Sequence, residues 1–467
     1  MQLTSPFFLF LFFPISLPLV LLLPKAARRI SLSLISVLWF VLANVRNPLG
    51  LAHVALLIFF ATILAYLPLP RRISVAKTRT VLGISLPIAT FLAARILTEY
   101  FPQLYIHPTG LLFITLSIVS YFIDAARGDT VLPRNPLELI GYFLFFPTLT
   151  VGPILRSKLF FDLTEQIAFT PEGFTRGIRR YMTGFVKCLA VAAVFLRGIR
   201  DILSFSALGL HPLSYLFLLV FSFLGFYFAF TGSADIAVGL SAMYGLELPR
   251  DRSRLLLAAV PHRVLYGTFL SMRSYLLDYI RQPLRRRLPA TAYRLLCTML
   301  FFVITLLALR TRPEMLLLAL PVLLTARLAL LPPFRKRCRI RRPLWRMLLT
   351  PLSALSCSFF TLGFFLEKPM GVLQLARAAL GSSIPYQPHY VLGMIQDGRY
   401  LALLSILLLL MIPYPYLRRL LCRKWGDRAT KCFVIAETVL IFAAFVLTIV
   451  FFMPQFPQYA VSSIFRM

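Results

Sequence analysis

The chain has few acidic residues and little polar surface for its length. Among 467 residues there are 17 Asp and Glu against 49 Lys and Arg, and charged residues make up only 14% of the sequence. Hydrophobic residues make up 59%, which leaves too few polar side chains to cover a soluble protein of this size. The composition therefore excludes an ordinary soluble globular domain.

The sequence also lacks the signatures of several enzyme classes. It contains no P-loop, no dinucleotide-binding glycine pattern, no G-x-S-x-G elbow and no HExxH helix. The six cysteines form no CxxC pair and are typical of buried residues or free thiols, so we expect no metal site. A net charge of +32 would indicate nucleic acid in a soluble chain.

What the sequence does contain is a series of apolar runs, each long enough to cross a bilayer of about 30 Å. Short basic clusters separate these runs, as cytoplasmic loops do under the positive-inside rule, so membrane topology explains the charge without a nucleic-acid partner. We predict an all-α polytopic membrane protein with about eleven to thirteen transmembrane helices, surrounded by membrane lipids.

The predicted spans cover residues 6–23, 30–45, 51–68, 80–97, 110–123, 181–197, 212–245, 295–309, 314–331, 347–366, 401–417 and 432–453. We expect one membrane domain over 1–467, with N-terminal spans (1–100), a core (101–366), an outer loop (367–400) and C-terminal spans (401–467). The outer loop is predicted to place an amphipathic helix at the membrane surface. Basic residues after the first span place the N-terminus outside the cytoplasm.

One apolar segment, residues 138–155, carries Pro147, Gly152 and Pro153 and has basic residues at both ends. This pattern predicts a re-entrant segment that enters the membrane and returns, which requires protein or water around its irregular backbone. The alternative is a straight helix that is kinked at Pro147. A second partly inserted segment is predicted over 256–280.

Residues 227–284 contain YFAFTGSAD, later LELP, and at the end LLDYIRQPL. This block resembles the central block of the membrane-bound O-acyltransferase (MBOAT) family. Two further segments are similar to its bacterial branch, which acetylates alginate and D-alanylates teichoic acids. They are 108–129, with Ser120, Tyr121, Asp124, Arg127 and Gly128, and 145–157, with Phe146, Pro147, Gly152, Pro153, Ile154 and Arg156. The resemblance implies an MBOAT-like helical bundle and O-acyltransferase chemistry.

The chain departs from the family at the residue that the resemblance implies to be catalytic. The family's histidine falls on Phe269, and a second family histidine would fall near residues 310–313, where none occurs. Phenylalanine cannot accept the proton that an attacking hydroxyl releases. His262 lies seven residues earlier, which on a helix is the same face about 10 Å away, with Tyr266 between. His262 is therefore either a substitute base or an interfacial histidine.

Five ionisable residues lie in or beside apolar spans, where a charge is costly unless it pairs or faces water. With Tyr227 and Tyr266 they form the candidate set for an internal cavity. The alternative for each is a structural ion pair that fixes helix packing. The five residues are Asp124, Arg127, Arg156, Asp235 and Asp278.

Three functions stay open. The first is a catalytically degenerate MBOAT-like protein of cell-envelope polysaccharide acylation or assembly, in the bacterial cytoplasmic (inner) membrane, which holds an extracytoplasmic acyltransferase or a polysaccharide synthesis complex. The second is an active O-acyltransferase that moves an acyl group from acyl-CoA or an acyl-carrier thioester to an extracytoplasmic polysaccharide or carrier protein. The third is a lipid or polysaccharide transporter. No bound cofactor is expected in any of them.

Overall fold

The computed structural model describes residues 3–68, 73–101, 103, 107–149, 152–205, 210–248, 270–281, 296–297, 299–300, 303–304, 317–322, 355–366, 371–381 and 435–450. Each regular element in this part of the chain is helical. Within these residues, five helices are long and apolar enough to cross a membrane. The chain is therefore an all-α, multi-pass membrane protein, as the sequence predicts.

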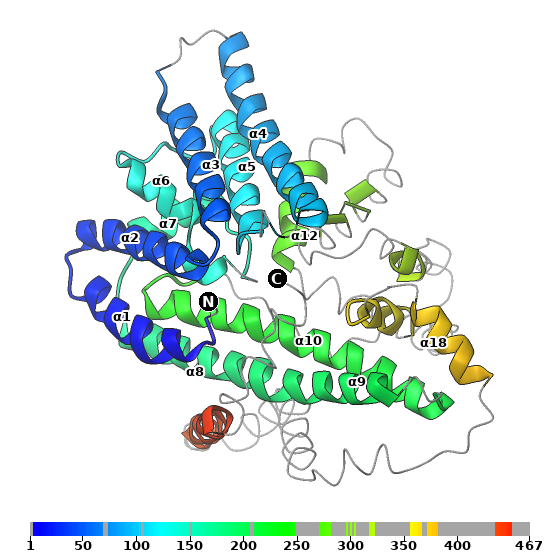
Figure 1. The fold of residues 1–467 in the computed structure, drawn as a ribbon. Coiled ribbons are helices and arrows are strands. Elements are labelled where there is room, and N and C mark those ends of the chain that lie inside the picture. Colours follow the sequence, from blue (N-terminus) through cyan, green and yellow to red (C-terminus); the bar gives the residue numbers. More distant parts are fainter. Residues whose placement is uncertain are drawn as a thin grey trace, which may run out of the picture. The chain divides into compact units, whose positions relative to one another are not determined.

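Figure 1 shows the helices of the described residues, coloured along the sequence. They are η1 (Phe8–Phe12), α1 (Phe13–Leu21), α2 (Lys25–Asn44), α3 (Pro48–Tyr66), α4 (Ile73–Tyr100), α5 (Leu111–Arg127), α6 (Pro136–Phe143), η2 (Phe146–Thr148), α7 (Ser157–Glu165), α8 (Pro171–Val186), η3 (Lys187–Ala192), α9 (Ala193–Phe205), α10 (Pro212–Met243), α12 (Leu270–Leu276), η5 (Leu277–Arg281) and α18 (Gly371–Leu380). A further apolar helix covers Ile435–Val450.

The first five predicted spans are confirmed as helices, and so is the span predicted over 212–245. The helix predicted over 181–197 begins earlier than expected, because α8, η3 and α9 form one continuous run over Pro171–Ser204. The first turns of this run contain both basic and apolar residues and form an amphipathic helix. Mean hydropathy does not detect such a helix, because its polar and apolar residues cancel. Residues 355–363 of the span predicted over 347–366 are helical, and the helix Ile435–Val450 confirms the span predicted over 432–453. The spans predicted over 295–309, 314–331 and 401–417 lie mostly or wholly outside the described residues.

The chain forms two compact units whose stretches alternate along the sequence. Unit 1 contains Met1–Tyr181, Ala234–Arg250 and Ser274–Pro283, and unit 2 contains Met182–Ser233, Asp251–Arg273 and Leu284–Met467. Because both units are built from interleaved stretches, neither corresponds to a separate segment of the sequence. The single domain over 1–467 stays a prediction.

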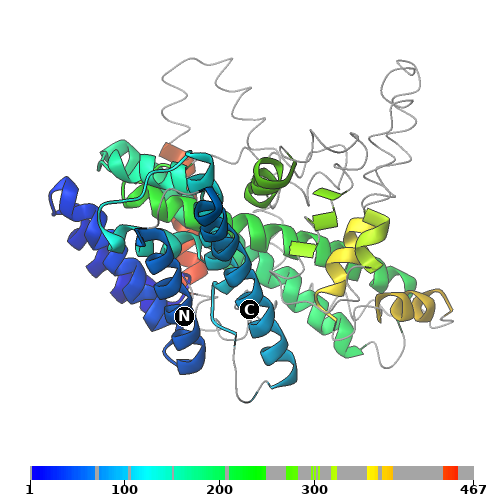
Figure 2. The same ribbon diagram turned by 90° about the horizontal axis from the view of Figure 1, so that it is seen from above.

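In unit 1 the N-terminal helices pack against one another. Helix α2 contacts α1, α3 and α6, while α4 packs along α5 and α5 also contacts α6 and α7. Figure 2 views these blue and cyan helices from above. Aromatic side chains fill the core of this unit, and Trp39 lies 4.9 Å from Phe8 and 4.7 Å from Phe12 between ring centroids.

Local sequence signals set the ends of these helices. Asn47 and Asn135 each accept a backbone N–H bond at the start of α3 and α6, and a proline follows each of them. Gly128 ends α5 and Gly245 ends α10, both with positive φ. At each end two backbone bonds close the Schellman pattern, which favours glycine because a β-carbon is strained there.

Helices α8 and α10 approach closely within unit 1. A β-carbon placed on Gly239 would lie 2.5 Å from the backbone nitrogen of Tyr181 and 2.7 Å from the carbonyl oxygen of Gly177. Real side chains do not tolerate such distances to backbone atoms. The two glycines therefore permit a contact between helix backbones that any larger residue would prevent.

In unit 2 the first part of α10 packs against later parts of the chain. Its Tyr215 hydroxyl donates to the Val372 carbonyl of α18 over 3.0 Å, and Phe226 lies 5.2 Å from Phe364 between ring centroids. Helix α18 confirms a helix in the predicted outer loop. Val372 and Ala379 are buried, whereas Leu373 and Leu380 are exposed, so its placement at a membrane surface stays a prediction.

Candidate functional site

The C-terminal end of α5 brings a serine, a carboxylate and an arginine into one region of unit 1. Ser120 and Asp124 are four residues apart, so they lie on the same face of the helix, one turn from each other. Ser120 is fully buried and Asp124 is 4% exposed, whereas Arg127 is exposed. The motif that resembles the MBOAT family thus supplies two buried polar side chains, Ser120 and Asp124, and a glycine, Gly128, at which the helix ends.

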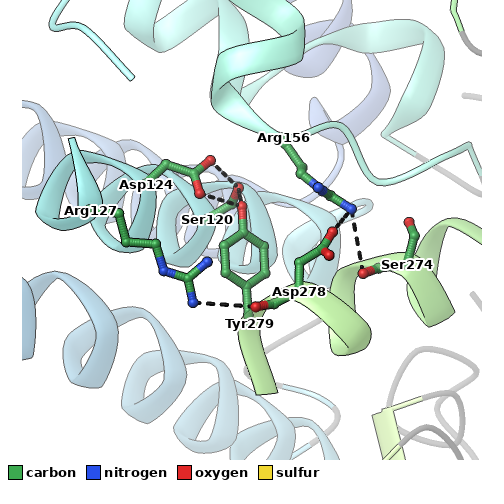
Figure 3. Close-up of polar contacts among 7 residues, drawn as sticks. All are labelled: Ser120, Asp124, Arg127, Arg156, Ser274, Asp278 and Tyr279. Atoms are coloured by element: carbon green, nitrogen blue, oxygen red, sulfur yellow. Dashed lines mark hydrogen bonds and ion pairs between the residues drawn. The ribbon is translucent and has the colours of Figure 1, made fainter. Parts of the chain in front are cut away.

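The Asp124 carboxylate is contacted by hydroxyl groups from three elements, of which Figure 3 shows those of Ser120 and Tyr279. Ser157, the first residue of α7, donates to Oδ2 over 2.7 Å, and Tyr279 of η5 donates to Oδ1 over 2.8 Å. Ser120 lies 3.5 Å from Oδ2. We call Ser120, Asp124, Ser157 and Tyr279 the hydroxyl cluster.

The direction of the bonds in the hydroxyl cluster follows from the number of protons. A tyrosine hydroxyl carries one proton, and that of Tyr279 goes to Asp124. In the 2.7 Å bond between Ser120 and Tyr279, Ser120 is therefore the donor. Burial, together with the adjacent Asp124 carboxylate, raises the pKa of Tyr279 above its usual value of 10.0, so the phenol keeps its proton at neutral pH.

Asp278, the residue before Tyr279, faces a different partner. Its carboxylate forms an ion pair with the Arg156 guanidinium, and Arg156 also contacts the Ser274 carbonyl over 3.5 Å. Arg127 donates to the Asp278 carbonyl over 3.3 Å, and its guanidinium carbon lies 5.3 Å from the centroid of the Tyr279 ring. The predicted carboxylate–arginine pairing is thus present for Asp278.

The π-helical geometry of η5 matters for these contacts. Asp278 and Tyr279 are consecutive residues, yet both contact the elements around α5 and α7 (Figure 3). A π-turn contains more residues than an α-turn, so neighbouring side chains diverge less around the helix axis. Single π-turns inside helices occur frequently at functional sites.

The segment predicted as re-entrant is not one straight helix. Helix α6 ends at Phe143, a single 3-10 turn follows at Phe146–Thr148, and α7 begins at Ser157. The kinked-helix alternative is therefore wrong, because Pro147, which has no N–H group for a continuous helix, lies in a separate turn between two helices. Tyr142 ties the two sides of this break together by donating to the Leu155 carbonyl over 3.0 Å.

Two other predicted cavity residues lie on α10, outside the hydroxyl cluster. Asp235 accepts a 2.9 Å bond from Arg180 of α8 within unit 1. Tyr227 belongs to unit 2, where it is 7% exposed. The structure therefore groups Asp124, Arg127, Arg156 and Asp278, pairs Asp235 with Arg180, and assigns Tyr227 to unit 2. Whether any of these residues lines a cavity stays a prediction.

The remaining predicted site residues, His262, Tyr266 and Phe269, lie outside the described residues. Within the described part of the chain, no group of three His, Cys, Asp or Glu side chains could hold a metal ion. Residues 249–269 lie outside the described part of the chain, so the expected lack of a metal site stays a prediction.

Sequence reasoning missed the roles of Ser157, Arg180 and Tyr279. Ser157 directly follows Arg156, and Tyr279 directly follows Asp278. Their position next to a predicted site residue was the one sequence feature that could have indicated them. Arg180 lies on the polar face of an amphipathic helix, where no pattern distinguishes it from Arg176 or Arg179. Only the packing of α8 on α10 shows which arginine reaches Asp235.

The hydroxyl cluster has no hydroxyl group that faces solvent. Ser120 and Ser157 are fully buried and Tyr279 is 7% exposed, and their protons are used within the cluster. Such an arrangement holds three elements together and offers no nucleophile to a substrate. The exposed groups beside it are the guanidinium groups of Arg127 and Arg156.

Several curated proteins are similar in sequence to this chain. A probable alginate O-acetylase of Pseudomonas putida is 30% identical over 179 residues, which are 37% of this chain and 35% of the relative. A probable alginate O-acetylase of Pseudomonas fluorescens is 30% identical over 202 residues, 41% of this chain and 39% of the relative. A teichoic acid D-alanyltransferase of Bacillus subtilis is 29% identical over 151 residues, 30% of this chain and 36% of the relative.

No protein-family model matches the chain, and the similarity spans little more than a third of the length of these relatives. The names of the relatives nevertheless agree with the two activities that the bacterial MBOAT resemblance implies. The resemblance found in the sequence is thereby confirmed: over about a third of its length, the chain is similar to proteins named alginate O-acetylase and teichoic acid D-alanyltransferase.

Proposed function

We propose that this chain takes part in the acylation of a cell-envelope polymer without itself performing the acyl transfer. Support for the process comes from its relatives, whose names denote O-acetylation of alginate and D-alanylation of teichoic acid. Support for the loss of chemistry comes from one position in the sequence, Phe269.

The placement of Phe269 carries the proposal. With Pro249 upstream and Asp278 downstream kept in register, the family's histidine position falls on this phenylalanine. Acyl transfer to a hydroxyl needs a group that removes its proton, and losing such a base lowers the rate by about 10²–10⁴-fold. A phenyl ring cannot replace that group.

The residues that keep the register downstream of Phe269 also form polar contacts with distant parts of the chain. Asp278 pairs with Arg156, and Tyr279 bonds to Asp124. These contacts are retained while the residue at the family's proton-acceptor position is replaced. We therefore infer that the protein acts as a scaffold and not as a catalyst. Its role would be to hold an extracytoplasmic acyltransferase or a polysaccharide synthesis complex at the bacterial cytoplasmic membrane, with its own N-terminus outside.

The alternative is an active O-acyltransferase. His262 favours it, because this histidine lies in the same stretch as Phe269 and could act as base if the reacting groups were shifted toward it. The donor would be acyl-CoA or an acyl-carrier thioester, and the acceptor would be a hydroxyl of an extracytoplasmic polysaccharide or carrier protein.

Acyl transfer by the purified full chain separates the two proposals. The chain is reconstituted in liposomes, given labelled acetyl-CoA and alginate, and compared with the Pseudomonas putida relative and with its own His262→Ala variant. We expect label in alginate at the level of empty liposomes for both forms of this chain. Transfer above that level, abolished by His262→Ala, would refute the scaffold proposal and establish the active enzyme.

Complex formation tests the scaffold role separately. The tagged chain is purified from its native membrane after crosslinking, and the copurified proteins are assayed for transfer of labelled acetyl groups to a polysaccharide. We expect the complex to show transfer that the isolated chain lacks. A complex without any acyltransferase or polysaccharide synthase would contradict this role.

A further inference from the structure

The segment Ser274–Pro283 occupies an unusual place in the chain. It belongs to unit 1, whereas the stretches on both sides of it, Asp251–Arg273 and Leu284–Met467, belong to unit 2. The polypeptide therefore enters unit 1 for a short segment and leaves it again. Contacts of this segment with the rest of unit 1 must retain it there, because neither flanking stretch belongs to that unit.

Two kinds of polar contact join the segment to unit 1. The buried kind consists of the Tyr279 hydroxyl in the hydroxyl cluster and the Tyr275 hydroxyl, which donates to the Leu116 carbonyl over 3.1 Å. The more exposed kind is the ion pair between Arg156 and Asp278, whose side chains are 38% and 24% exposed, together with the bonds from Arg156 and Arg127 to the carbonyls of Ser274 and Asp278. The two kinds have different energetic weight.

Exposed ion pairs contribute little, because water screens the charges and two long side chains lose freedom on pairing. A buried carboxylate that loses a hydrogen-bond donor is costly, because water does not replace the missing partner. Tyr279 is 7% exposed and Asp124 is 4% exposed, so their bond is of the second type. The buried bond, not the ion pair, is therefore expected to decide whether the segment stays in place.

We propose that the bond between Tyr279 and Asp124 is a latch that retains Ser274–Pro283 in unit 1. Tyr279 and Asp124 are thus positioning residues for Ser274–Pro283. This inference is independent of whether the chain transfers acyl groups.

Hydrogen–deuterium exchange of the full chain in detergent tests the latch. The change is Tyr279→Phe, which keeps the ring beside Arg127 and Tyr275 and removes one hydroxyl. Amide exchange of peptides from 274–283 is expected to accelerate roughly tenfold or more, as the loss of a hydrogen bond to a buried charged group predicts. Peptides from α1–α4 are expected to exchange at the rate of the unchanged protein.

Two further variants make the test specific. Tyr244→Phe removes another buried tyrosine hydroxyl of unit 1, which bonds to Ser16 over 2.6 Å, and it should leave exchange in 274–283 unchanged. Arg156→Gln breaks the exposed ion pair and should accelerate that exchange less than threefold, with the difference vanishing in high salt.

The proposal is overturned if Tyr279→Phe leaves exchange in 274–283 unchanged, or if Arg156→Gln accelerates it as much. An equal acceleration in every peptide of unit 1 would also overturn it, because the hydroxyl would then support only global stability. Should Tyr279→Phe fail to fold, Asp124→Asn provides the same readout, since it changes the acceptor of the same bond and leaves the segment's own residues unchanged.

Discussion

The hydroxyl proton of Tyr279 is donated to the carboxylate of Asp124 over 2.8 Å, although the two residues are separated by 155 positions in the sequence. One is on a helix of the N-terminal part, and the other is on a short π-helical turn of the central block. Because both are buried, their bond joins two parts of the family-like pattern that no local sequence signal connects.

Replacing the carboxylate of Asp124 by an amide should destabilise unit 1. An amide has one acceptor oxygen where the carboxylate has two, so either Ser157 or Tyr279 loses its acceptor. We expect Asp124→Asn to lower the free energy of unfolding by about 1–3 kcal/mol. Thermal unfolding of the detergent-solubilised protein measures this. Asp162→Asn, a matched change at an exposed position of α7, should have almost no effect, and equal losses for both variants would contradict the prediction.

The ion pair between Arg156 and Asp278 should contribute much less to stability. Both side chains are partly exposed, and such pairs contribute about 0–1 kcal/mol. We expect Asp278→Asn to lower the unfolding free energy by less than about 1 kcal/mol at low salt. Melting curves at low and high ionic strength check this, because screening should remove the difference from the unchanged protein. A large loss that persists in high salt would show that the pair is effectively buried.

Gly239→Ala should be strongly destabilising. The added methyl group would lie 2.5 Å from the Tyr181 backbone nitrogen, and a backbone atom cannot rotate away as a side chain can. We expect α8 and α10 to separate, with a loss of about 1–3 kcal/mol or more, as for other overpacked positions. The control is Gly371→Ala, where the nearest atom lies at an ordinary 3.6 Å. Comparable melting temperatures for the two variants would show that the close helix contact is wrong.

The raised pKa of Tyr279 predicts a loss of stability in alkaline solution. The folded-state pKa lies above the unfolded value of 10.0, so above that pH the unfolded chain binds fewer protons than the folded one. Stability from this group is complete below pH 10 and falls as pH rises beyond it. Melting temperatures measured from pH 8 to pH 11 should fall less steeply for Tyr279→Phe than for the unchanged protein. Parallel curves would mean that Tyr279 does not contribute to the pH dependence.

Part of the site could be predicted from the sequence because the signals were local. A four-residue spacing, as between Ser120 and Asp124, is that of one helix face, and a glycine such as Gly128 commonly ends a helix. The prolines and Gly152 indicated irregular backbone after Phe143, which the structure shows as a break between two short helices. These features depend only on the residues beside them.

Other parts could not be predicted, because they depend on which distant groups meet. Ionisable residues near apolar spans indicated a polar interior but not their partners. Asp124 is contacted by hydroxyl groups, whereas Asp235 and Asp278 are contacted by arginines. Hydropathy also predicted too late a start, at residue 181, for the helix that begins at Pro171 and contains Arg180. The first turns of this helix are amphipathic and therefore have no net apolar signal.

The sequence by itself determined that the chain is helical and crosses a membrane. It has too few polar residues to cover a surface in water, and in lipid a helix satisfies its own backbone hydrogen bonds. It also determined the family resemblance and the phenylalanine at the histidine position. Only the tertiary structure decided that Tyr279 bonds to Asp124 and that Ser274–Pro283 belongs to unit 1. Those facts depend on burial and on hydrogen-bond partners far apart in sequence, and burial is a property of the packed helices, not of any residue alone.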